Sequence, residues 1–487
     1  MKKIITFLLV LTSGLAVASQ GNEWWSDISG AQARTSGETS IQTTTCRFLH
    51  LSLANMESYL STSPMEFTDA ARLKNVVLEL PSPDGSFKRF RIVESPVCAP
   101  ELAAKFPETR TWSGQGIDDA TATVRLDVTP FGFHAMILSA NGDIFIDPVN
   151  LQTTENYICY FRKDCIRRNQ TSICGFNPED EWNTKQIEEL RAIYNNHHDE
   201  ERSMGDNLRT YTLALACTGE YAAVFGGTVS GAHAAMVTSV NRVTGVYEKE
   251  LAIRMTLIPN NDTLIYLNSA TDPYDNNNGS TMLGQNQTIV SSRIGSANYD
   301  IGHVFSTGGG GIAGLGVVCT SAQKARGVTG LPNPVGDAFD IDFVAHEMGH
   351  QFGGNHTFNS VSGNCGGNNR HASAAYEPGS GITIMGYAGI CSSDDLAAHS
   401  IANFHTISFD EIEDYTTFAS GSSCPTTTAT GNNPPTPALT DYHYDIPLMT
   451  PFTLTGIGSD PDGDTITYSW EEFDLGPGGA WNAPSGN

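Results

Sequence analysis

Positive charge is scarce in this chain of 487 residues. Lys and Arg together number 27 against 53 Asp and Glu, which gives a formal net charge of -26 at pH 7. Proteins that bind nucleic acid usually present a basic surface, so this composition excludes a nucleic-acid partner from the expected functions. Long apolar runs are scarce as well, because after residue 18 no stretch reaches the ~18 apolar residues that a membrane helix needs. We therefore expect no nucleic acid and no membrane span.

Residues 1–18 have the three parts of a secretory signal. Lys2 and Lys3 precede an apolar run over residues 4–17, and Ala16-Val17-Ala18 supplies the small residues of a cleavage site. Ten cysteines agree with export, since disulfides persist outside the cytosol. We expect a secreted protein, and attachment to the cell surface through a region beyond residue 487 stays open.

The remaining chain divides into units with different sequence patterns. Residues 19–205 are predicted to form a separate β-rich unit, because short strand-like runs alternate with turns. These runs cover residues 76–80, 87–93, 122–128 and 132–138. Over residues 206–424 apolar strands alternate with helical stretches, which predicts an α/β unit with a mostly parallel sheet. Its strands are expected at 211–216, 252–258 and 301–305, and its helices at 229–250 and 285–294.

The C-terminal part has the composition of a linker followed by strands. Residues 425–437 are rich in Thr, Asn and Pro, which is typical of an exposed linker. Residues 438–487 predict strands at 452–456 and 465–470. They are the expected start of an Ig-like β-sandwich, which needs about 100 residues, so we expect the chain to continue beyond them.

Two short segments have compositions that often bind ligands. Asp460, Asp462 and Asp464 lie between the expected C-terminal strands and either bind Ca²⁺ or form an ordinary acidic turn. Residues 306–311 read Ser-Thr-Gly-Gly-Gly-Gly, but no Gly-Lys-Ser or Gly-Lys-Thr follows, so a phosphate loop is excluded. The segment instead predicts a loop before an edge strand at residues 313–318, which could hold an extended peptide by strand addition.

One stretch contains every element of the pattern H-E-x-x-H-x-x-G-x-x-H, between His346 and His356. His346 and His350 are four residues apart, so on a helix both project from one face and can bind one zinc ion. Gly353 then ends the helix and lets His356 return as a third ligand. Three protein ligands leave the fourth zinc position open, as in a catalytic site, and Glu347 is placed as general base for a zinc-activated water. The core H-E-x-x-H occurs by chance in unrelated helices, and the two further fixed residues make a real site the better interpretation.

A methionine follows this motif at Met385, within Ile-Thr-Ile-Met-Gly-Tyr-Ala-Gly at residues 382–389. The zinc motif and this methionine together resemble the metzincin peptidases. The wider segment over about 206–424 resembles their bacterial reprolysin-like, adamalysin-related branch, and the region before it resembles the propeptide of that branch. The resemblance implies an α/β metzincin-type catalytic domain with a mostly parallel sheet, an edge strand over the cleft and zinc on the active-site helix.

The resemblance also implies roles for single residues. His346, His350 and His356 match the zinc ligands, Glu347 the general acid and base, and Met385 the methionine of a tight turn beneath the metal. The implied function is a zinc endopeptidase that hydrolyses internal bonds of proteins or peptides, made as a zymogen that its own propeptide inhibits. A rival from another class is an inactive extracellular adhesion or binding protein on the same scaffold, which the intact Glu347 argues against.

The cysteines leave pairing questions open. For four cysteines of the catalytic region the resemblance suggests two disulfides, although the sequence alone allows three pairings. The suggested pairs are Cys319–Cys424 and Cys365–Cys391. Cys174-Gly175 resembles the cysteine switch of related zymogens, in which a propeptide thiolate occupies the open zinc position. The alternative is a disulfide between Cys174 and Cys217 that would tie the two units.

Two positions depart from the reprolysin-like branch. Thr357 follows the third histidine, where adamalysins commonly have aspartate. Tyr387, two residues after Met385, matches the spacing at which astacin-like members carry a tyrosine near zinc. Tyr387 is therefore a candidate metal-proximal hydroxyl, with a packed aromatic as the alternative.

Overall fold

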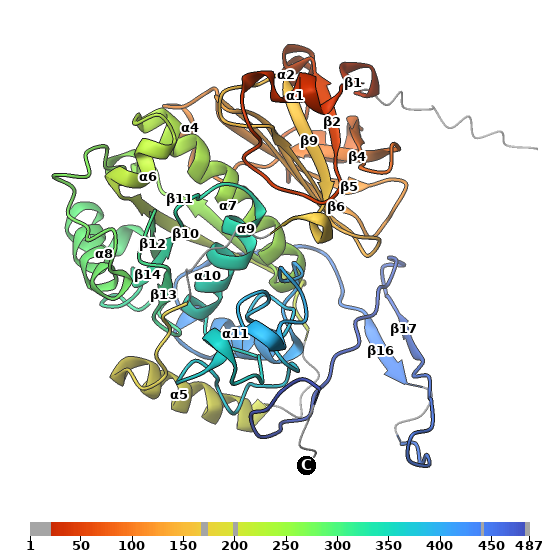
Figure 1. Cartoon of the computed structure of the whole chain (residues 1–487), viewed down its shortest axis with the longest axis vertical. Helices are drawn as coiled ribbons and strands as arrows, with labels where there is room; N and C mark the ends of the chain where they lie inside the picture. The colour runs from red at the N-terminus through yellow and green to blue at the C-terminus, as the bar shows by residue number, and fades with distance from the viewer. Residues whose placement is uncertain (1–20, 167–173, 198–202, 440–442, 483–487) are drawn as a thin grey trace, which may run out of the picture.

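The computed structural model describes residues 21–166, 174–197, 203–439 and 443–482. The predicted signal at residues 1–18 lies outside these ranges. An N-terminal β unit lies against an α/β unit, and a short C-terminal pair of strands projects beside them (Figure 1). Within the described residues no helix is both long and apolar enough to cross a membrane.

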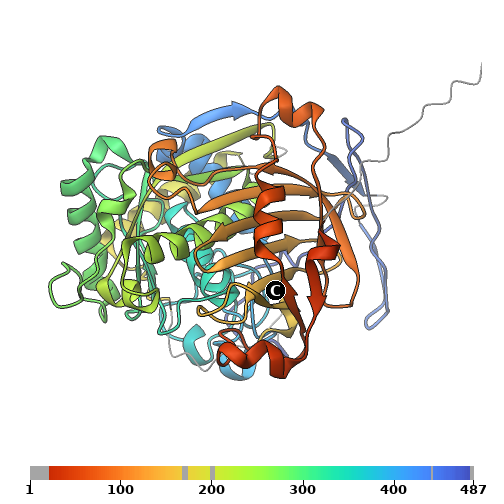
Figure 2. The ribbon, with the colours of Figure 1, turned by 90° about the horizontal axis from the view of Figure 1, so that it is seen from above.

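The N-terminal unit is a nine-stranded antiparallel sheet in the order β1-β2-β9-β8-β7-β6-β5-β4-β3. Its strands are β1 (Trp25–Asp27), β2 (Arg47–Leu51), β3 (Val77–Pro81), β4 (Phe87–Glu94), β5 (Arg110–Gly116), β6 (Thr123–Thr129), β7 (Gly132–Leu138), β8 (Ile144–Pro148) and β9 (Asn156–Phe161). The strand-like runs predicted here are confirmed as β3, β4, β6 and β7. Figure 2 shows the long strands side by side. The short helices of this unit are α1 (Gly30–Ala33), α2 (Leu53–Leu60), α3 (Asp69–Leu73) and α4 (Pro100–Ala103).

This sheet curls until its two ends meet. Arg47 on β2 donates from Nη1 to the carbonyl oxygen of Ser82, just past β3, over 3.1 Å. Alternate side chains of the strands, among them Trp25, Trp112 and Phe133, fill a core of their own inside the curl. The N-terminal unit therefore has a barrel-like form with its own hydrophobic centre.

The α/β unit confirms the predicted mostly parallel sheet. Its strands are β10 (Asn207–Cys217), β11 (Ile253–Leu257), β12 (Ile301–Ser306), β13 (Gly311–Ala313), β14 (Gly327–Gly330) and β15 (Thr426–Ala429). The order is β11-β10-β12-β14-β13, in which β10, β11, β12 and β14 are parallel and β13 is antiparallel. β15 pairs with the first residues of β10, so the segment expected to be a linker begins with a strand of this sheet. Its run of β-branched threonines suits that pairing.

The helices of the α/β unit are α6 (Gly219–Val224), α7 (Val229–Leu251), α8 (Gly279–Ile294), α9 (Asp337–Phe339), α10 (His346–Gln351) and α11 (Thr406–Phe418). α7 matches its prediction closely. α8 starts well before the expected residue 285, because the side chain of Asn278 accepts a hydrogen bond from the backbone of Thr281 and caps the helix there. A π-helical segment, Asp340–Ala345, joins α9 to α10, so the zinc motif lies on one continuous helical run.

The predicted edge strand was placed too late in the sequence. The paired residues are Gly311–Ala313, and the chain turns away after them, so residues 314–318 are not part of the sheet. The glycine-rich run therefore leads directly into the edge strand β13.

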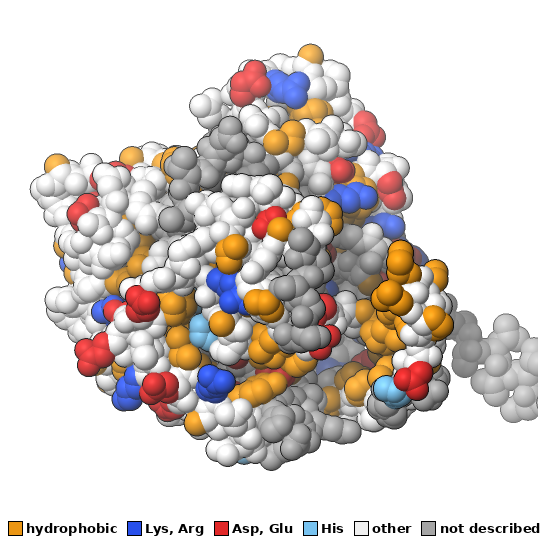
Figure 3. Space-filling model, turned by 60° about the horizontal axis from the view of Figure 1, so that its bottom comes forward, with side chains coloured by type: hydrophobic (Ala, Val, Ile, Leu, Met, Phe, Trp, Pro, Cys, Tyr) orange, Lys and Arg blue, Asp and Glu red, His pale blue; other side chains and the backbone are white. Residues whose placement is uncertain are grey.

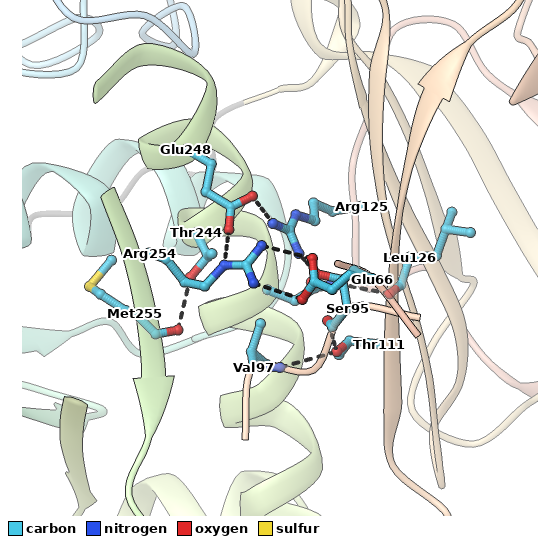
Figure 4. Close-up of polar contacts among 11 residues, drawn as sticks. Glu66, Ser95, Val97, Thr111, Arg125, Leu126, Thr244, Glu248, Arg254 and Met255 are labelled. Carbon is cyan, nitrogen blue, oxygen red and sulfur yellow. Dashed lines mark hydrogen bonds and ion pairs between the residues drawn. The ribbon is translucent and has the colours of Figure 1, made fainter. Parts of the chain in front are cut away.

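The two units share a polar interface along α7 and β11. Residues 97–99 extend the sheet past β11, since Leu257 N donates to Val97 O over 2.8 Å and Ala99 N donates to Leu257 O over 2.9 Å. Figure 4 shows the ion pairs next to this contact: Glu248 of α7 binds both Arg125 of β6 and Arg254 of β11. Arg254 in turn reaches Glu66 of the N-terminal unit, with an Nη1 to Oε1 distance of 2.7 Å.

The C-terminal segment differs from the prediction. β16 (Thr436–Leu439) pairs with β17 (Gly456–Ser459), whereas residues 465–470 form no strand. A β-sandwich needs two packed sheets, and the described residues contain one exposed pair of strands. In Figure 3 apolar side chains cover the surface of this segment. They include Tyr444, Ile446, Leu448, Met449, Phe452, Leu454, Ile457, Tyr468 and Trp470.

The acidic loop of this segment is an ordinary turn. Asp460 accepts hydrogen bonds from the backbone N of Asp462 and Asp464, over 2.8 and 3.0 Å. The carboxylate of Asp462 is held by Asn433. Because the side chains are used inside the loop, the calcium prediction gains no support here.

Candidate metal centre

The three histidines of the motif meet in the interior of the α/β unit. His346 and His350 project from α10, and the Nε2 atoms of both approach Nε2 of His356, at 3.3 and 3.1 Å. Each ring donates from Nδ1 to a backbone carbonyl: Ile384 O at 2.7 Å, Gly354 O at 2.7 Å and Asn369 O at 2.6 Å. These bonds fix the tautomers, so that the three Nε2 lone pairs point toward one centre.

The distances fit a tetrahedral zinc ion. Two Nε2 atoms that share one zinc at about 2.05 Å lie about 3.3 Å apart, and such a nitrogen lies about 3.5 Å from a thiolate sulfur bound at about 2.3 Å. The sulfur of Cys174 lies 3.5 Å from Nε2 of His350. Cys174, His346, His350 and His356 offer ligand atoms that all lie within 4.8 Å of one another, and the described residues contain no second such group of His, Cys, Asp or Glu.

Glu347 is fully buried beside this centre. Its side chain packs against the edge strand at Gly311, where an added Cβ would come within 2.0 Å of the carboxylate oxygen Oε1. The glycine-rich run therefore ends in a residue that must be glycine to leave space for the base. Burial raises the pKa of Glu347 to about 8, and the neighbouring thiol of Cys174 opposes part of this rise.

Steric constraints explain why two positions of the motif are glycine. A Cβ on Gly349 would lie 2.4 Å from the sulfur of Met385, which is fully buried beneath α10. Gly353 has a φ of 102°, a conformation that L side chains rarely adopt, and it turns the chain so that His356 returns to the centre. The structure thus places both Met385 and His356 where the sequence predicted.

Tyr387 lies next to the metal centre. Its ring centroid is 4.6 Å from that of His356 and 5.7 Å from that of His346. Its hydroxyl donates to the carbonyl oxygen of Cys174 over 3.2 Å. The ring thus packs against two of the three histidines, and the hydroxyl faces the segment that carries Cys174.

Residues 174–176, which precede the catalytic unit in the chain, lie at the metal centre. Gly175 N donates to Gly311 O over 2.6 Å, and Cys174 and Gly311 form a parallel β-bridge. The ring of Phe176 stacks on His350 at a centroid distance of 4.4 Å. Cys174 and Cys217 both carry free thiols, so the alternative disulfide between them is wrong. The two suggested disulfides, Cys319–Cys424 and Cys365–Cys391, are both confirmed.

Thr357, which stands where adamalysins commonly have aspartate, binds a carboxylate that no sequence motif indicated. The buried carboxylate of Glu377 accepts from the hydroxyl of Thr357 over 2.5 Å and from that of Thr383 over 2.6 Å. Its other oxygen accepts from the backbone N of Ile382 and of Thr383. Glu377 thus ties the residue after the third histidine to the turn that carries Met385.

Comparisons with known proteins agree with this geometry. Residues 207–414 match the sequence profile of the reprolysin-like metallopeptidases, family M12B. A search of curated proteins finds no match. A solved structure, metalloproteinase-II from Bacteroides fragilis, is similar at 10% identity over 73% of this chain and 97% of that chain, with a TM-score of 0.35, a likeness too low to carry an argument. The family match and the intact histidine triad lead to one conclusion: this chain carries a catalytic domain that belongs to the reprolysin-like metallopeptidase family M12B.

Proposed function

We propose that the protein is a secreted zinc endopeptidase that hydrolyses internal peptide bonds of proteins and is made as a zymogen. The observation that carries this proposal is the convergence of three tautomer-fixed Nε2 atoms beside a buried Glu347, with the thiol of Cys174 at the fourth corner. Three histidines with one further position are the ligand pattern of catalytic rather than structural zinc.

The chemistry divides between the ion and the chain. A zinc ion held by these histidines lowers the pKa of a water molecule and polarises a carbonyl group. Glu347 takes the proton of the attacking water and passes it to the leaving amine nitrogen, so no nucleophilic side chain is required. Tyr387, whose hydroxyl already donates to one backbone carbonyl at this place, donates in the same way to the carbonyl oxygen of the scissile bond.

The edge strand supports cleavage within a chain rather than at its ends. The backbone of Gly311 binds the backbone of Gly175, which shows that β13 holds an extended segment next to the metal centre. Binding through backbone groups needs no free terminus. We infer that substrates are extended stretches of protein or peptide.

Latency follows from the same contacts. Residues 174–176 occupy the place beside β13 and put a sulfur at the fourth corner of the site. A thiolate bound there excludes the water that hydrolysis needs. Activation then requires cleavage between the N-terminal and catalytic units and withdrawal of this segment.

Export is proposed on the features of residues 1–18 and on two disulfides in the catalytic unit. Disulfides persist in oxidising compartments and are rare in the cytosol.

Casein hydrolysis tests the proposal. Zinc-loaded protein, activated by proteolytic cleavage, should hydrolyse casein, and both a zinc chelator and Glu347→Ala should abolish this. Glu250→Gln, which changes a half-buried carboxylate away from the metal centre, should keep the activity. Hydrolysis that survives the chelator, or its absence after removal of the N-terminal unit, would refute the proposal.

Latency is tested in the uncleaved chain. Cys174→Ala should raise casein hydrolysis above that of the wild type, whereas Cys217→Ala, at an equally buried free thiol, should not. Equal rates for both variants would show that the thiol of Cys174 does not hold the enzyme inactive.

A further inference from the structure

The imidazole of His356 is oriented by a loop rather than by a helix or strand. Its Nδ1 donates to the carbonyl oxygen of Asn369 over 2.6 Å, which fixes the tautomer that leaves Nε2 free for a metal ion. Asn369 lies in the loop of residues 366–373, between the disulfide at Cys365 and the turn at Ala374. The orientation of the third ligand therefore depends on how firmly this loop is held.

The end of the described chain packs against this loop. Residues 471–479, which we call the tail, return to the α/β unit beside α11 (Figure 1). Arg370 of the loop donates from Nη2 to the carbonyl oxygen of Gly476 in the tail over 2.7 Å. The same guanidinium donates from Nε to the side-chain oxygen of Asn359 over 2.9 Å. One side chain thus joins the loop to the tail and to a residue three positions after the third histidine.

Asn359 binds the tail as well. Its Nδ2 donates to the carbonyl oxygen of Pro477 over 3.3 Å, and its own carbonyl oxygen accepts from the backbone N of Gly479 over 3.3 Å. The tail passes close to the loop here, because a Cβ added to Gly478 would lie 3.3 Å from Nε of Arg370. Asn359, Arg370 and the tail therefore form a closed set of contacts in which each member binds the other two.

Aromatic stacking and a helix N-terminus hold the first part of the tail. The ring of Phe473 stacks on Tyr376 at a centroid distance of 4.3 Å, and the ring of His405 lies 6.1 Å away, nearly parallel to it. The carboxylate of Glu471 accepts from the backbone N and the hydroxyl of Thr406, over 2.6 and 2.7 Å, at the start of α11. A negative charge is favourable there, since the first N–H groups of a helix have no partner within it. The tail is thus fixed to the catalytic unit before it reaches the loop.

Activation should not remove the tail. It follows the catalytic unit in the sequence, whereas α5 (Glu181–His197) precedes that unit. α5 faces the same loop from another side, where Arg191 of α5 and His371 of the loop line a common cavity of about 150 Å³. In the proposed activation α5 is withdrawn with the N-terminal part. Of these two neighbours of the loop, the tail is then the one that remains.

We propose that the tail is a positioning element of the metal centre, which through Arg370 keeps the carbonyl oxygen of Asn369 within reach of His356. The inference rests on the proposed peptidase function only for its effect on hydrolysis, because zinc binding by the histidines is measured without a substrate. Loss of the hydrogen-bond partner of a ligating histidine typically lowers metal affinity by about 10- to 100-fold. Loosening the loop that supplies this partner should cost part of that factor.

The first experiment measures the zinc dissociation constant of the full uncleaved chain by competition with a chromophoric chelator. Arg370→Ala and Phe473→Ala should each raise it by about 3- to 10-fold. Phe473 is 42% exposed, so its truncation should leave the fold intact. Phe473→Tyr keeps the stacked ring and should keep the wild-type value.

A matched control lies one turn of chain away from these contacts. Trp470 is also large and exposed, but its ring lies against β17, where a Cβ added to Gly456 would come within 3.3 Å of it. Trp470→Ala should therefore leave the zinc dissociation constant unchanged.

The second experiment separates positioning from a general loss of stability. In the zinc-loaded full chain labelled with ¹⁵N-histidine, the Nδ1 protons of His346, His350 and His356 are each held by a carbonyl oxygen and should exchange slowly with water. In Arg370→Ala and Phe473→Ala one of the three should exchange at least about tenfold faster. The other two should not change, because their acceptors lie outside the loop.

The outcomes distinguish the two claims. Zinc affinity that is unchanged in both Arg370→Ala and Phe473→Ala overturns the positioning role of the tail. Equally faster exchange at all three histidines also overturns it, since that result indicates a general loss of stability. If the activated wild type fails to hydrolyse casein while zinc affinity and one histidine respond as expected, the peptidase function fails and the role of the tail stands.

Discussion

The sulfur of Cys174 lies 3.5 Å from Nε2 of His350, although 176 positions separate the two residues in the chain. The ring of Phe176 stacks on the same imidazole, and Tyr387 donates to the carbonyl oxygen of Cys174. The segment is thus held at three points around the metal centre. A site that the histidines alone would leave open at one corner is closed by the chain's own thiol.

Tyr387→Phe tests the role of the hydroxyl in the activated enzyme. A donor aimed at the scissile carbonyl acts mainly in the transition state, so kcat should fall by about 10- to 100-fold with a smaller change in KM. Tyr274→Phe is the matched control, because its buried hydroxyl bonds to Asn286 outside the metal centre. Unchanged kcat in Tyr387→Phe would mean that the ring serves packing alone.

Gly349→Ala tests the contact between the motif and the methionine turn. The new Cβ would lie 2.4 Å from the sulfur of the fully buried Met385, so that side chain must shift within its packed surroundings. We expect a loss of about 1–3 kcal/mol in the free energy of unfolding, together with weaker zinc binding. Gly284→Ala in α8 is the control, since no atom lies within 4 Å of its Cβ. It should stabilise the protein by about 0.5–1 kcal/mol. Equal Tm changes for the two variants would contradict the contact.

Glu377 is expected to position the third ligand through Thr357. Glu377→Ala leaves two backbone N–H groups, one of them buried, and two hydroxyls without their acceptor, which should cost about 2 kcal/mol or more and weaken zinc binding. Glu377→Gln keeps an oxygen for the backbone donors, and its amide can donate to the two hydroxyls, so it should be tolerated. Thermal unfolding and zinc titration measure both. Similar behaviour of the Ala and Gln variants would refute this role.

The raised pKa of Glu250 should make the stability of the protein depend on pH. Burial raises its pKa to about 7, although Lys249 and the donors Phe404 and Asn403 oppose the rise. Because the folded pKa lies above the unfolded value, the protonated form favours the fold. Its contribution is complete below about pH 4.5 and is lost as the pH rises to about 7, on the order of 3 kcal/mol.

Glu250→Gln should therefore flatten the decline in the free energy of unfolding between these pH values. Glu248→Gln supplies the opposite sign: burial raises the pKa of Glu248, but Arg125 and Arg254 together bring it below its ordinary value. Its carboxylate stabilises the fold above the unfolded pKa, so Glu248→Gln should destabilise at neutral pH and less in acid. Denaturant unfolding at several pH values measures both, and parallel curves for all three proteins would contradict the assignment.

The residues of the metal centre could be predicted because their geometry is local. The spacing of His346 and His350 on a helix, and the turn at Gly353, place three ligands within eleven residues. Of the strands described in the N-terminal unit, β3, β4, β6 and β7 could be predicted for the same reason, as could α7, since their hydrophobic patterns are regular.

Contacts between distant segments could not be predicted. Glu377 acts through donors at Thr357 and Thr383, and no spacing rule links them. Arg162 and Asp342 meet across 180 positions and two units. Residues 465–470 have a strand-like alternation, but a strand needs a neighbour, and none of the described residues supplies one. The edge strand was predicted too late in the sequence. Gly311 lies in this strand and leaves space for the carboxylate of Glu347, and such a contact is not visible in the local sequence pattern.

In the uncleaved chain we expect one zinc ion to be held by three histidines and by the thiol of Cys174. Zinc K-edge X-ray absorption on the full chain with one equivalent of zinc tests this directly. We predict three nitrogen ligands at about 2.0–2.1 Å and one sulfur at about 2.3 Å, with the sulfur lost in Cys174→Ser and after activation. A spectrum of the uncleaved chain with nitrogen and oxygen ligands only would contradict it.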